Sequence, residues 1–225
     1  MTAIVSQARI DSSRLPGKSL LLIDNKPLLH HVMIALNQIP VDKRILACPQ
    51  DSLSSFKPIV KQTGFEIITG SKEDVLDRYC KTIKKYSIKR LIRATADNPF
   101  VFTDAALSIN NEALAKNADY AGYTYLPYGA GVESVSASAL LLASESAALP
   151  FEREHVCPYL YNNPNIFNLH RPSAPSMWRY PDIRLTVDTQ EDYDRAVELY
   201  TALKNKPLRY NGCTIIKYYK KITGS

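Results

Sequence analysis

Hydrophobic positions in the first hundred residues fall into short apolar runs separated by longer stretches of helical spacing. The apolar runs, which are typical of buried strands, lie at residues 3–6, 44–47, 66–68 and 90–94. The stretches between them predict helices over residues 28–39, 51–62 and 73–86. Because strands and helices alternate, the pattern predicts an α/β fold with a mostly parallel sheet flanked by helices. Ligands of such sheets bind beyond the carboxyl ends of the strands.

The second half of the chain has a less regular pattern. Its spacing predicts helices over residues 103–116, 138–148, 151–161 and 191–204, and a last core strand over residues 184–187. Tyr- and Gly-rich loops lie between these elements. No internal repeat or linker interrupts the sequence, so we expect a single domain over residues 1–225.

Composition narrows the class of protein. With 225 residues, 45% of them hydrophobic and 22% charged, the chain is globular in composition, which excludes disordered and coiled-coil proteins. The formal charge of +6 suits an anionic ligand such as a nucleic acid, a phosphorylated metabolite or an anionic lipid surface. The sequence shows no secretory leader and no apolar run near the roughly 18 residues of a membrane span, so we expect a cytoplasmic protein. The four cysteines lack metal-ligand spacing, and we interpret them as reduced core thiols.

Two standard nucleotide-binding motifs fail in this sequence. A phosphate loop ending in Gly17 and Lys18 needs a glycine at position 12, where the chain has Ser12. A dinucleotide fingerprint that begins at Gly129 needs a glycine at position 134, where the chain has Ser134. Phosphate binding therefore has to be argued from other residues.

The loop after the first strand is the best candidate for phosphate binding. It places Arg9, Arg14 and Lys18 within ten residues, on a segment that contains Pro16 and Gly17. Arg offers a planar fork of donors and Lys a compact charge, and both bind phosphate oxygens strongly where water is partly excluded. The loop is able to wrap a triphosphate, although the same residues also fit a solvated basic loop.

Five stretches in order along the chain carry a resemblance to a known family. They are QARIDSSRLPGK at 7–18, GSKEDVLDRY at 70–79, RATADNP at 93–99, EREHVCPY at 152–159 and RLTVDTQED at 184–192. Together they resemble the cytidylyltransferases that activate sugar acids, such as CMP-Kdo and CMP-acylneuraminate synthetases, and the similarity is greatest to the branch of spore coat polysaccharide biosynthesis proteins. They span nearly the whole chain, so the resemblance applies to all of it.

The resemblance implies a fold and a reaction. The fold is the glycosyltransferase A-type, Rossmann-like nucleotide-binding fold, with a nucleotide-binding half at residues 1–100 and an acceptor-binding half at residues 101–225. The reaction transfers CMP from CTP to a small acidic sugar, a nonulosonic or Kdo-like acid, and releases pyrophosphate for surface polysaccharide or glycan biosynthesis. Mg²⁺ is the implied cofactor. Neither nucleic acid nor a membrane is an expected partner, and a homodimer is expected because the family is often dimeric.

The same resemblance assigns residues to roles. The triphosphate is held by Arg9 and Lys18 with support from Arg14, and the metal by Asp97 and Asp188. The remaining nucleotide-binding positions are Gln7, Ala8, Ser71 and Asp74. The acceptor-binding positions are Glu133, Arg153, His155 and Arg184, with Arg171 as a further candidate cation. Arg153 is the favoured partner for an acceptor carboxylate, because a buried carboxylate needs a cation and Arg153 lies in a matching stretch.

Other interpretations stay open at this point. Asp97 precedes Asn98 and Pro99 and is able to act as a turn residue, and Asp188 as a plain helix N-cap. The chain also departs from the family, with Val75 where many sugar-acid enzymes have Arg and Gly131 where the spore coat branch has Asp. One alternative is therefore a nucleotidyltransferase of the same fold with a different acceptor, for example a phosphate- or phosphonate-bearing alcohol, or with a different base. The other is a non-catalytic nucleotide or nucleic-acid binding module.

Overall fold

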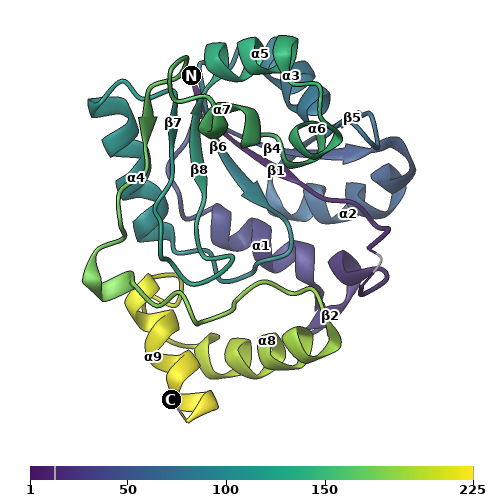
Figure 1. Cartoon of the computed structure of the whole chain (residues 1–225). Helices are drawn as coiled ribbons and strands as arrows, with labels where there is room; N and C mark the ends of the chain where they lie inside the picture. Colours follow the sequence, from purple (N-terminus) through teal and green to yellow (C-terminus); the bar gives the residue numbers. More distant parts are fainter. Residues whose placement is uncertain (13, 225) are drawn as a thin grey trace.

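A twisted sheet of seven strands organises the chain (Figure 1). The computed structural model describes residues 1–12 and 14–224. Across the sheet the strands follow the order β5 (Glu66–Gly70), β4 (Lys43–Pro49), β1 (Thr2–Gln7), β6 (Arg90–Thr95), β8 (Glu133–Ser136), β7 (Tyr120–Ala121) and β9 (Leu169–His170). The first four are parallel, whereas β8 runs antiparallel to both of its neighbours. The prediction of a mostly parallel sheet in an α/β fold is confirmed.

Helices cover both faces of the sheet. One face packs against α1 (Leu28–Leu36), α2 (Leu53–Thr63) and α4 (Thr103–Ala115). The other packs against α3 (Val75–Tyr86), α5 (Ala137–Ser146) and α7 (Pro158–Asn162), and α6 (Pro150–His155) lies against α3 and α7. In β1, Ile4 faces the first layer and Val5 the second, and both are fully buried. Burial on both faces explains why the central strands read as continuous apolar runs rather than as alternating patterns.

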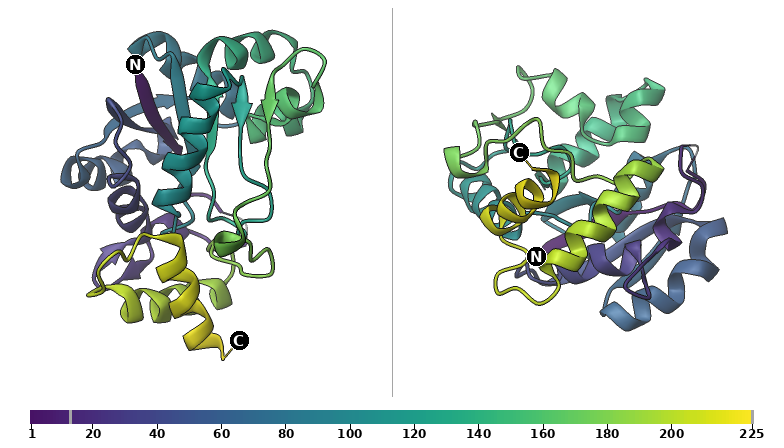
Figure 2. Two further views of the ribbon diagram at one scale, coloured as in Figure 1. Left: turned by 90° about the vertical axis from the view of Figure 1, so that its left-hand side faces the viewer. Right: turned by 90° about the horizontal axis from the view of Figure 1, so that it is seen from below.

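The C-terminal helices form a third layer at one end of the molecule. Figure 2 shows α8 (Gln190–Leu203) and α9 (Gly212–Thr223) at the end opposite the N-terminus, below the points where β1 and β6 finish. A separate apolar cluster, which includes Phe102, Trp178 and Leu199, holds them there. The smaller elements are the 3₁₀ helices η1 (Lys18–Leu20), η2 (Gln50–Ser52) and η3 (Ser176–Trp178) and the hairpin strands β2 (Leu22–Ile23) and β3 (Lys26–Pro27).

Register aligns the ends of the central strands. Gln7 at the end of β1 pairs with Ala47 in β4 and with Thr95 at the end of β6. The loops after β1 and β6 therefore leave the sheet side by side. The segment from Arg184 to Asp188 crosses below them on its way to α8, as Figure 1 shows.

Two sequence predictions about the second half need correction, and three short strands are additional to those expected. Residues 184–187 are not a sheet strand, because Leu185 and Val187 donate their backbone N–H groups to the loop carbonyls of Tyr128 and Asp97, at 2.9 and 2.8 Å. The helix predicted over 151–161 is split into α6 and α7, since Val156 has φ of +74° and Pro158 begins a new helix. The short strands β7, β8 and β9 were not predicted.

The remaining helix predictions are confirmed, with ends within three residues of those observed.

None of the helices in residues 1–12 and 14–224 has the length and apolar character needed to cross a bilayer. The four cysteines are free thiols: Cys48, Cys80 and Cys157 are buried and Cys213 is half-buried.

Candidate active site

The loop that leaves β1 folds back on itself and returns a lysine to the edge of the sheet. Gly17 has φ of +67°, which a side chain would strain, and its N–H donates to the carbonyl of Ile10 at 3.2 Å. This turn places Lys18 at the start of η1, with its side chain only 13% exposed. The sequence pattern of Pro and Gly before Lys is thus explained by the turn that aims the lysine inward.

Lys18 joins two aspartates that are far apart in the sequence. Its Nζ donates to Oδ2 of Asp97 at 3.1 Å and to Oδ1 of Asp188 at 2.8 Å. A third bond, at 2.9 Å, goes to the carbonyl of Val187. The fold therefore brings together the β1 loop, the end of β6 and the segment before α8. We call Lys18, Asp97 and Asp188 the carboxylate cluster.

Arginines surround Asp188. Nη2 of Arg14 lies 3.0 Å from its Oδ1 and Nη2 of Arg184 lies 2.7 Å from its Oδ2. Burial raises the pKa of Asp188, but its hydrogen bond to Lys18 and the nearby positive charges outweigh burial and lower the pKa overall. Asp188 is therefore held as a carboxylate, with a side chain that is only 7% exposed.

The helix cap next to Asp188 is made by other residues. The N-cap of α8 is Thr189, whose hydroxyl accepts from the N–H of Asp192, while the Asp192 carboxylate accepts from the N–H groups of Asp188 and Thr189. The interpretation of Asp188 as a plain N-cap is thus wrong. Its side chain is left to point into the carboxylate cluster.

Asp97 is positioned by the loop between Tyr125 and Gly131. The amide of Asn98 donates to the carbonyl of Gly129, and its Oδ1 accepts from the N–H of Phe100 at 2.9 Å. Gly129 has φ of +92°, and a Cβ there would lie 3.0 Å from the backbone nitrogen of Thr186. This close approach lets the loop bridge the two chain segments that carry Asp97 and Asp188.

We expect Gly129→Ala to destabilise the protein by about 1–3 kcal/mol, the range for a residue forced into a strained backbone region. Both the positive φ and the contact with Thr186 oppose a Cβ at this position. Urea unfolding followed by circular dichroism measures the change. Gly64→Ala is the matched control, because Gly64 also has a positive φ, +74°, but open space around its Cβ position. If the two variants lose the same stability, the close approach to Thr186 contributes nothing.

The other expected nucleotide-binding residues lie around the same edge. Ala8 is buried beside the end of β1. The Arg9 guanidinium is half-exposed, 3.5 Å from the carboxylate of Glu154 on α6. Ser71 and Asp74 shape the start of α3: the Ser71 hydroxyl accepts from the N–H of Asp74, and Asp74 caps the helix through the N–H of Asp77. These contacts bring the β1 loop, the α3 entrance and α6 to one rim.

Two arginines expected to bind the acceptor are committed to other partners. Nε of Arg153 donates to Oδ2 of Asp74 at 2.9 Å, Nη2 donates to the same oxygen, and Nη1 donates to the carbonyl of Ser144 at 2.8 Å. Arg184 is fixed by Asp188 and Asp192. Arg153 therefore fastens α6 to α3 and α5, and this ion pair argues against the carboxylate-binding role favoured from the sequence.

Glu133 is also engaged. Its carboxylate accepts from Nη1 of Arg93 on the neighbouring strand and, at 2.9 Å, from the hydroxyl of Tyr120. Nη2 of Arg93 reaches Oε1 of Gln7 at 3.4 Å, which links this group to β1. His155, at the end of α6, is exposed and stacks against Phe151 with ring centres 4.4 Å apart.

Two buried arginines near this edge of the sheet are not among the site residues expected from the sequence. Arg78 on α3 is 2% exposed, and its Nε and Nη1 have no hydrogen-bond partner among the described residues; burial lowers its pKa. Arg93 lies in the largely buried strand β6 and pairs with Glu133. A charged residue in a strand that is buried on both faces is the signal that could have identified Arg93.

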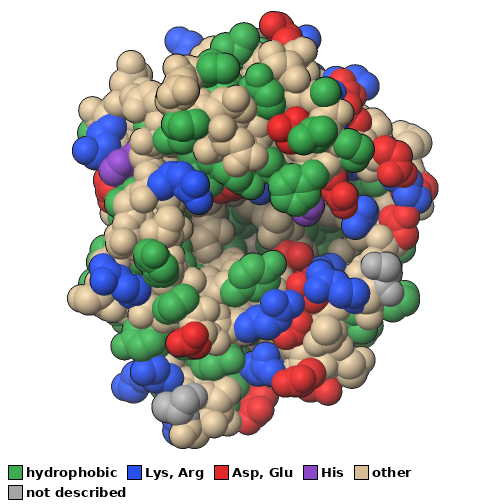
Figure 3. All heavy atoms as spheres, viewed as in Figure 1, with side chains coloured by type: hydrophobic (Ala, Val, Ile, Leu, Met, Phe, Trp, Pro, Cys, Tyr) green, Lys and Arg blue, Asp and Glu red, His purple; other side chains and the backbone are tan. Residues whose placement is uncertain are grey.

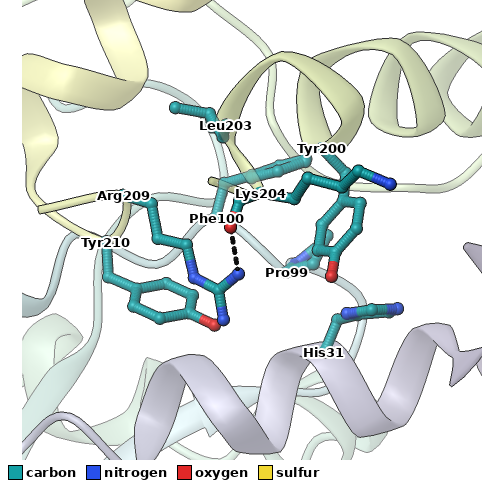
Figure 4. A pocket seen from close by; sticks show the side chains of 8 residues that line it. All are labelled: His31, Pro99, Phe100, Tyr200, Leu203, Lys204, Arg209 and Tyr210. Carbon is teal, nitrogen blue, oxygen red and sulfur yellow. Dashed lines mark hydrogen bonds between the residues drawn. The ribbon is translucent and has the colours of Figure 1, made fainter. Parts of the chain in front are cut away.

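Seen from outside, the site lies along a hollow in one face. Figure 3 shows this hollow across the middle of the view, with Lys, Arg, Asp and Glu side chains gathered along its lower right margin. A separate pocket lies between α1 and α8 (Figure 4). It is lined by His31, Pro99, Phe100, Tyr200, Leu203, Lys204, Arg209 and Tyr210. Among these described lining residues there is no carboxylate, so this pocket does not share the chemistry of the carboxylate cluster.

Comparison with known proteins assigns the chain to a protein family. The sequence profile of the family described as cytidylyltransferase matches residues 2–222. The chain belongs to the cytidylyltransferase family. It is therefore a nucleotidyltransferase, as the sequence motifs predicted.

Individual relatives agree with this assignment. The chain is 34% identical over 211 residues to the spore coat polysaccharide biosynthesis protein SpsF of Bacillus subtilis, covering 90% of this chain and 88% of that protein. A cytidylyltransferase structure from Leptospira borgpetersenii superposes with a TM-score of 0.89 at 24% identity, over 99% of this chain and 95% of that one. A CMP-Kdo synthetase solved with CTP has a TM-score of 0.69 at 19% identity, over 89% and 98% of the two chains. These two similarities show that this cytidylyltransferase shares their fold.

Proposed function

We propose that this cytidylyltransferase transfers CMP from CTP to an acidic sugar and releases pyrophosphate, for the synthesis of a surface polysaccharide. The observation that carries the proposal is the carboxylate cluster, in which Lys18 from the loop after β1 joins Asp97, just after β6, to Asp188, just before α8. The acceptor hydroxyl attacks the α-phosphorus, the bond to the β-phosphate breaks, and the hydroxyl proton is released. A non-catalytic binding module has no need of two converging carboxylates.

The carboxylate cluster fits a magnesium ion. Oxygens of Asp97, Asp188 and the Val187 carbonyl all lie within 3.1 Å of one point, now taken by the Lys18 Nζ. Hard oxygen donors suit magnesium, which uses one or two carboxylates and keeps several waters. The proposed protein ligands are the two aspartates alone, since no group of three or more His, Cys, Asp or Glu side chains in the described residues is placed to hold a metal. When bound, the ion supplies charge neutralisation at the phosphate oxygens.

The residues around the carboxylate cluster have different roles in this proposal. Arg9, Arg14 and Lys18 supply the positive charge that holds the β- and γ-phosphates and stabilises the departing pyrophosphate. The nucleotide lies along the rim formed by the β1 loop and the start of α3, which includes Gln7, Ala8, Ser71 and Asp74. In this proposal residues 1–100 are the nucleotide-binding half and residues 101–225 the acceptor-binding half.

Arg171 is the acceptor cation in this proposal, in place of Arg153. Its guanidinium carbon lies 5.1 Å from the ring centre of Tyr161, and it makes no hydrogen bond or ion pair with any described residue. The Tyr161 ring is 5.7 Å from that of Tyr120, whose hydroxyl binds Glu133. Arg171 and Glu133 therefore belong to one connected group of side chains. In this group Arg171 would bind the acceptor carboxylate, and Glu133 would accept hydrogen bonds from the sugar hydroxyls.

Pyrophosphate release across the four nucleoside triphosphates tests the reaction. Each is supplied with Kdo, N-acetylneuraminate, a panel of other sugar acids, and neutral and phosphorylated sugars, at fixed magnesium. We expect release with CTP and a sugar acid, and poor activity with Kdo and N-acetylneuraminate, because Gly131 replaces a carboxylate of the spore coat branch. Turnover confined to phosphate- or phosphonate-bearing acceptors would contradict the sugar-acid proposal and support an acceptor of that class.

A cytoplasmic location and a homodimeric state belong to the same proposal. Cell fractionation tests the location, and light scattering tests the oligomeric state.

We expect Arg171→Gln to raise the KM for the best sugar acid by about tenfold or more, because the acceptor carboxylate loses a charge-assisted partner worth roughly 1.5–3 kcal/mol. The KM for CTP should change less than twofold. Steady-state pyrophosphate release measures both. Lys57→Gln is the matched control, since it removes one exposed positive charge from α2, on the other face of the sheet. An equal KM increase in both variants would show a general charge effect and contradict the role of Arg171.

A further inference from the structure

The Lys18 ammonium stands where a divalent cation is expected. Its three acceptors are two carboxylate oxygens and one backbone carbonyl, at 2.8–3.1 Å, all hard oxygens that also suit a metal. The side chain is 13% exposed, so this position is largely shielded from water. An ammonium and a divalent cation cannot occupy one point, and like charges a few ångströms apart repel strongly in a partly buried site.

We propose that Lys18 is a resident counter-ion that keeps a divalent cation out of the nucleotide-free protein and yields its place when a triphosphate arrives. This inference rests on the proposed metal role of Asp97 and Asp188. The phosphates offer the ammonium new anionic partners. The divalent cation then enters together with the nucleotide rather than before it.

The charges around Asp188 support this arrangement. Arg14 and Arg184 lie within 3.0 Å of its carboxylate in addition to Lys18, so three cations share one buried anion. A carboxylate that is already compensated in this way attracts a free divalent cation weakly. The triphosphate changes the balance, because it adds several negative charges beside Arg14 and Lys18.

The geometry of Lys18 allows the exchange without refolding. Its backbone is fixed by the Gly17 turn and by η1, while the four-carbon stem reaches the carboxylate cluster from one side. A rotation of the flexible stem would move Nζ by several ångströms while η1 stays in place. Linkage then requires that nucleotide and metal each increase the affinity for the other.

Mn²⁺ binding without nucleotide tests the inference. Electron paramagnetic resonance of free Mn²⁺ gives the dissociation constant for the wild type, Lys18→Met and Lys72→Met. We expect Lys18→Met to bind Mn²⁺ about tenfold or more tightly than the wild type, as removal of one neighbouring unit charge implies. Lys72→Met should stay within twofold of the wild type, because Lys72 pairs with the exposed carboxylates of Asp11 and Asp51 outside the carboxylate cluster.

Two further measurements locate the effect. Asp97→Asn in the Lys18→Met background should return Mn²⁺ binding to the wild-type level. In the wild type, the ¹⁵N signal of the Lys18 ammonium should persist in millimolar Mg²⁺ and change only when CTP is also present. This second measurement needs no folded variant.

Two outcomes overturn the inference. One is a folded Lys18→Met variant that binds Mn²⁺ no more tightly than the wild type. The other is loss of the Lys18 ammonium signal in Mg²⁺ alone. If pyrophosphate release still depends on both Asp97 and Asp188, either outcome removes the role of Lys18 as a counter-ion and leaves the proposed reaction standing. Loss of that dependence would instead remove the proposed function.

Discussion

Asp97→Asn and Asp188→Asn should each lower the rate of pyrophosphate release by about a hundredfold or more while the protein stays folded, the scale seen when one preorganised electrostatic contact is lost. An amide has the shape of a carboxylate but lacks its charge, so it is a poor ligand for a hard cation. Each variant keeps a side-chain oxygen that accepts from Lys18. For Asp97 the expected loss is therefore chemical rather than structural.

The measurement is the initial rate of pyrophosphate release at saturating CTP, acceptor and magnesium. Asp182→Asn is the matched control, because Asp182 is exposed in the connection just before Arg184. Circular dichroism and the urea midpoint confirm that each variant is folded. Asp188→Asn has the greater structural risk, since three cations would lose their shared anion. A near-normal rate for either variant at high magnesium would contradict a metal role for that residue.

The central part of the sheet could be predicted because each of its strands shows as a short run of neighbouring residues in the sequence. Residues 3–6 are apolar except for Ser6, and residues 90–94 contain three apolar residues and two arginines. Stretches of helical spacing separate these short runs. The strands β7 and β9 have two residues each, and β8 contains Glu133, Ser134 and Ser136. Such strands carry no periodic signal, and only pairing with distant segments creates them.

The candidate site likewise combines local motifs, which the sequence predicts, with contacts between distant residues, which it does not. The Pro-Gly turn before Lys18 and the Asp after β6 can be recognised in the sequence, because each belongs to a short local motif. The contact of Asp97 and Asp188 with the same lysine cannot be predicted from their spacing. Arg153 was chosen for the acceptor because its stretch matched the family. Its partner, Asp74, is 79 residues away in sequence, so only the fold could show that the arginine is already committed.

The Arg93 and Glu133 pair is the second place where a large effect is expected. Their side chains are 11% and 21% exposed, and they are direct neighbours on β6 and β8. Burial alone would lower the pKa of Arg93, yet the carboxylate of Glu133 reverses this and raises it. Arg93 is therefore held as a cation, and loss of Glu133 would leave this charge buried and uncompensated.

Arg93→Met should destabilise the protein by about 3–5 kcal/mol, the range for breaking one partner of a buried ion pair. Glu133→Gln should also destabilise it, while the double variant should recover part of the loss, since neither charge then remains unpaired. Urea unfolding of the four proteins gives the coupling energy. Additive losses, with no recovery, would show that the pair is not coupled and contradict this interpretation.

The same four proteins separate a structural role of Glu133 from acceptor binding. If Glu133 only balances Arg93, the stable double variant should keep the wild-type KM for the sugar acid. If its carboxylate also accepts hydrogen bonds from the acceptor, the KM should stay raised even where stability is recovered. Because Tyr120 connects Glu133 to Tyr161 and Arg171, we expect the second result. A wild-type KM in the double variant would confine Glu133 to the core of the sheet and leave Arg171 as the acceptor contact.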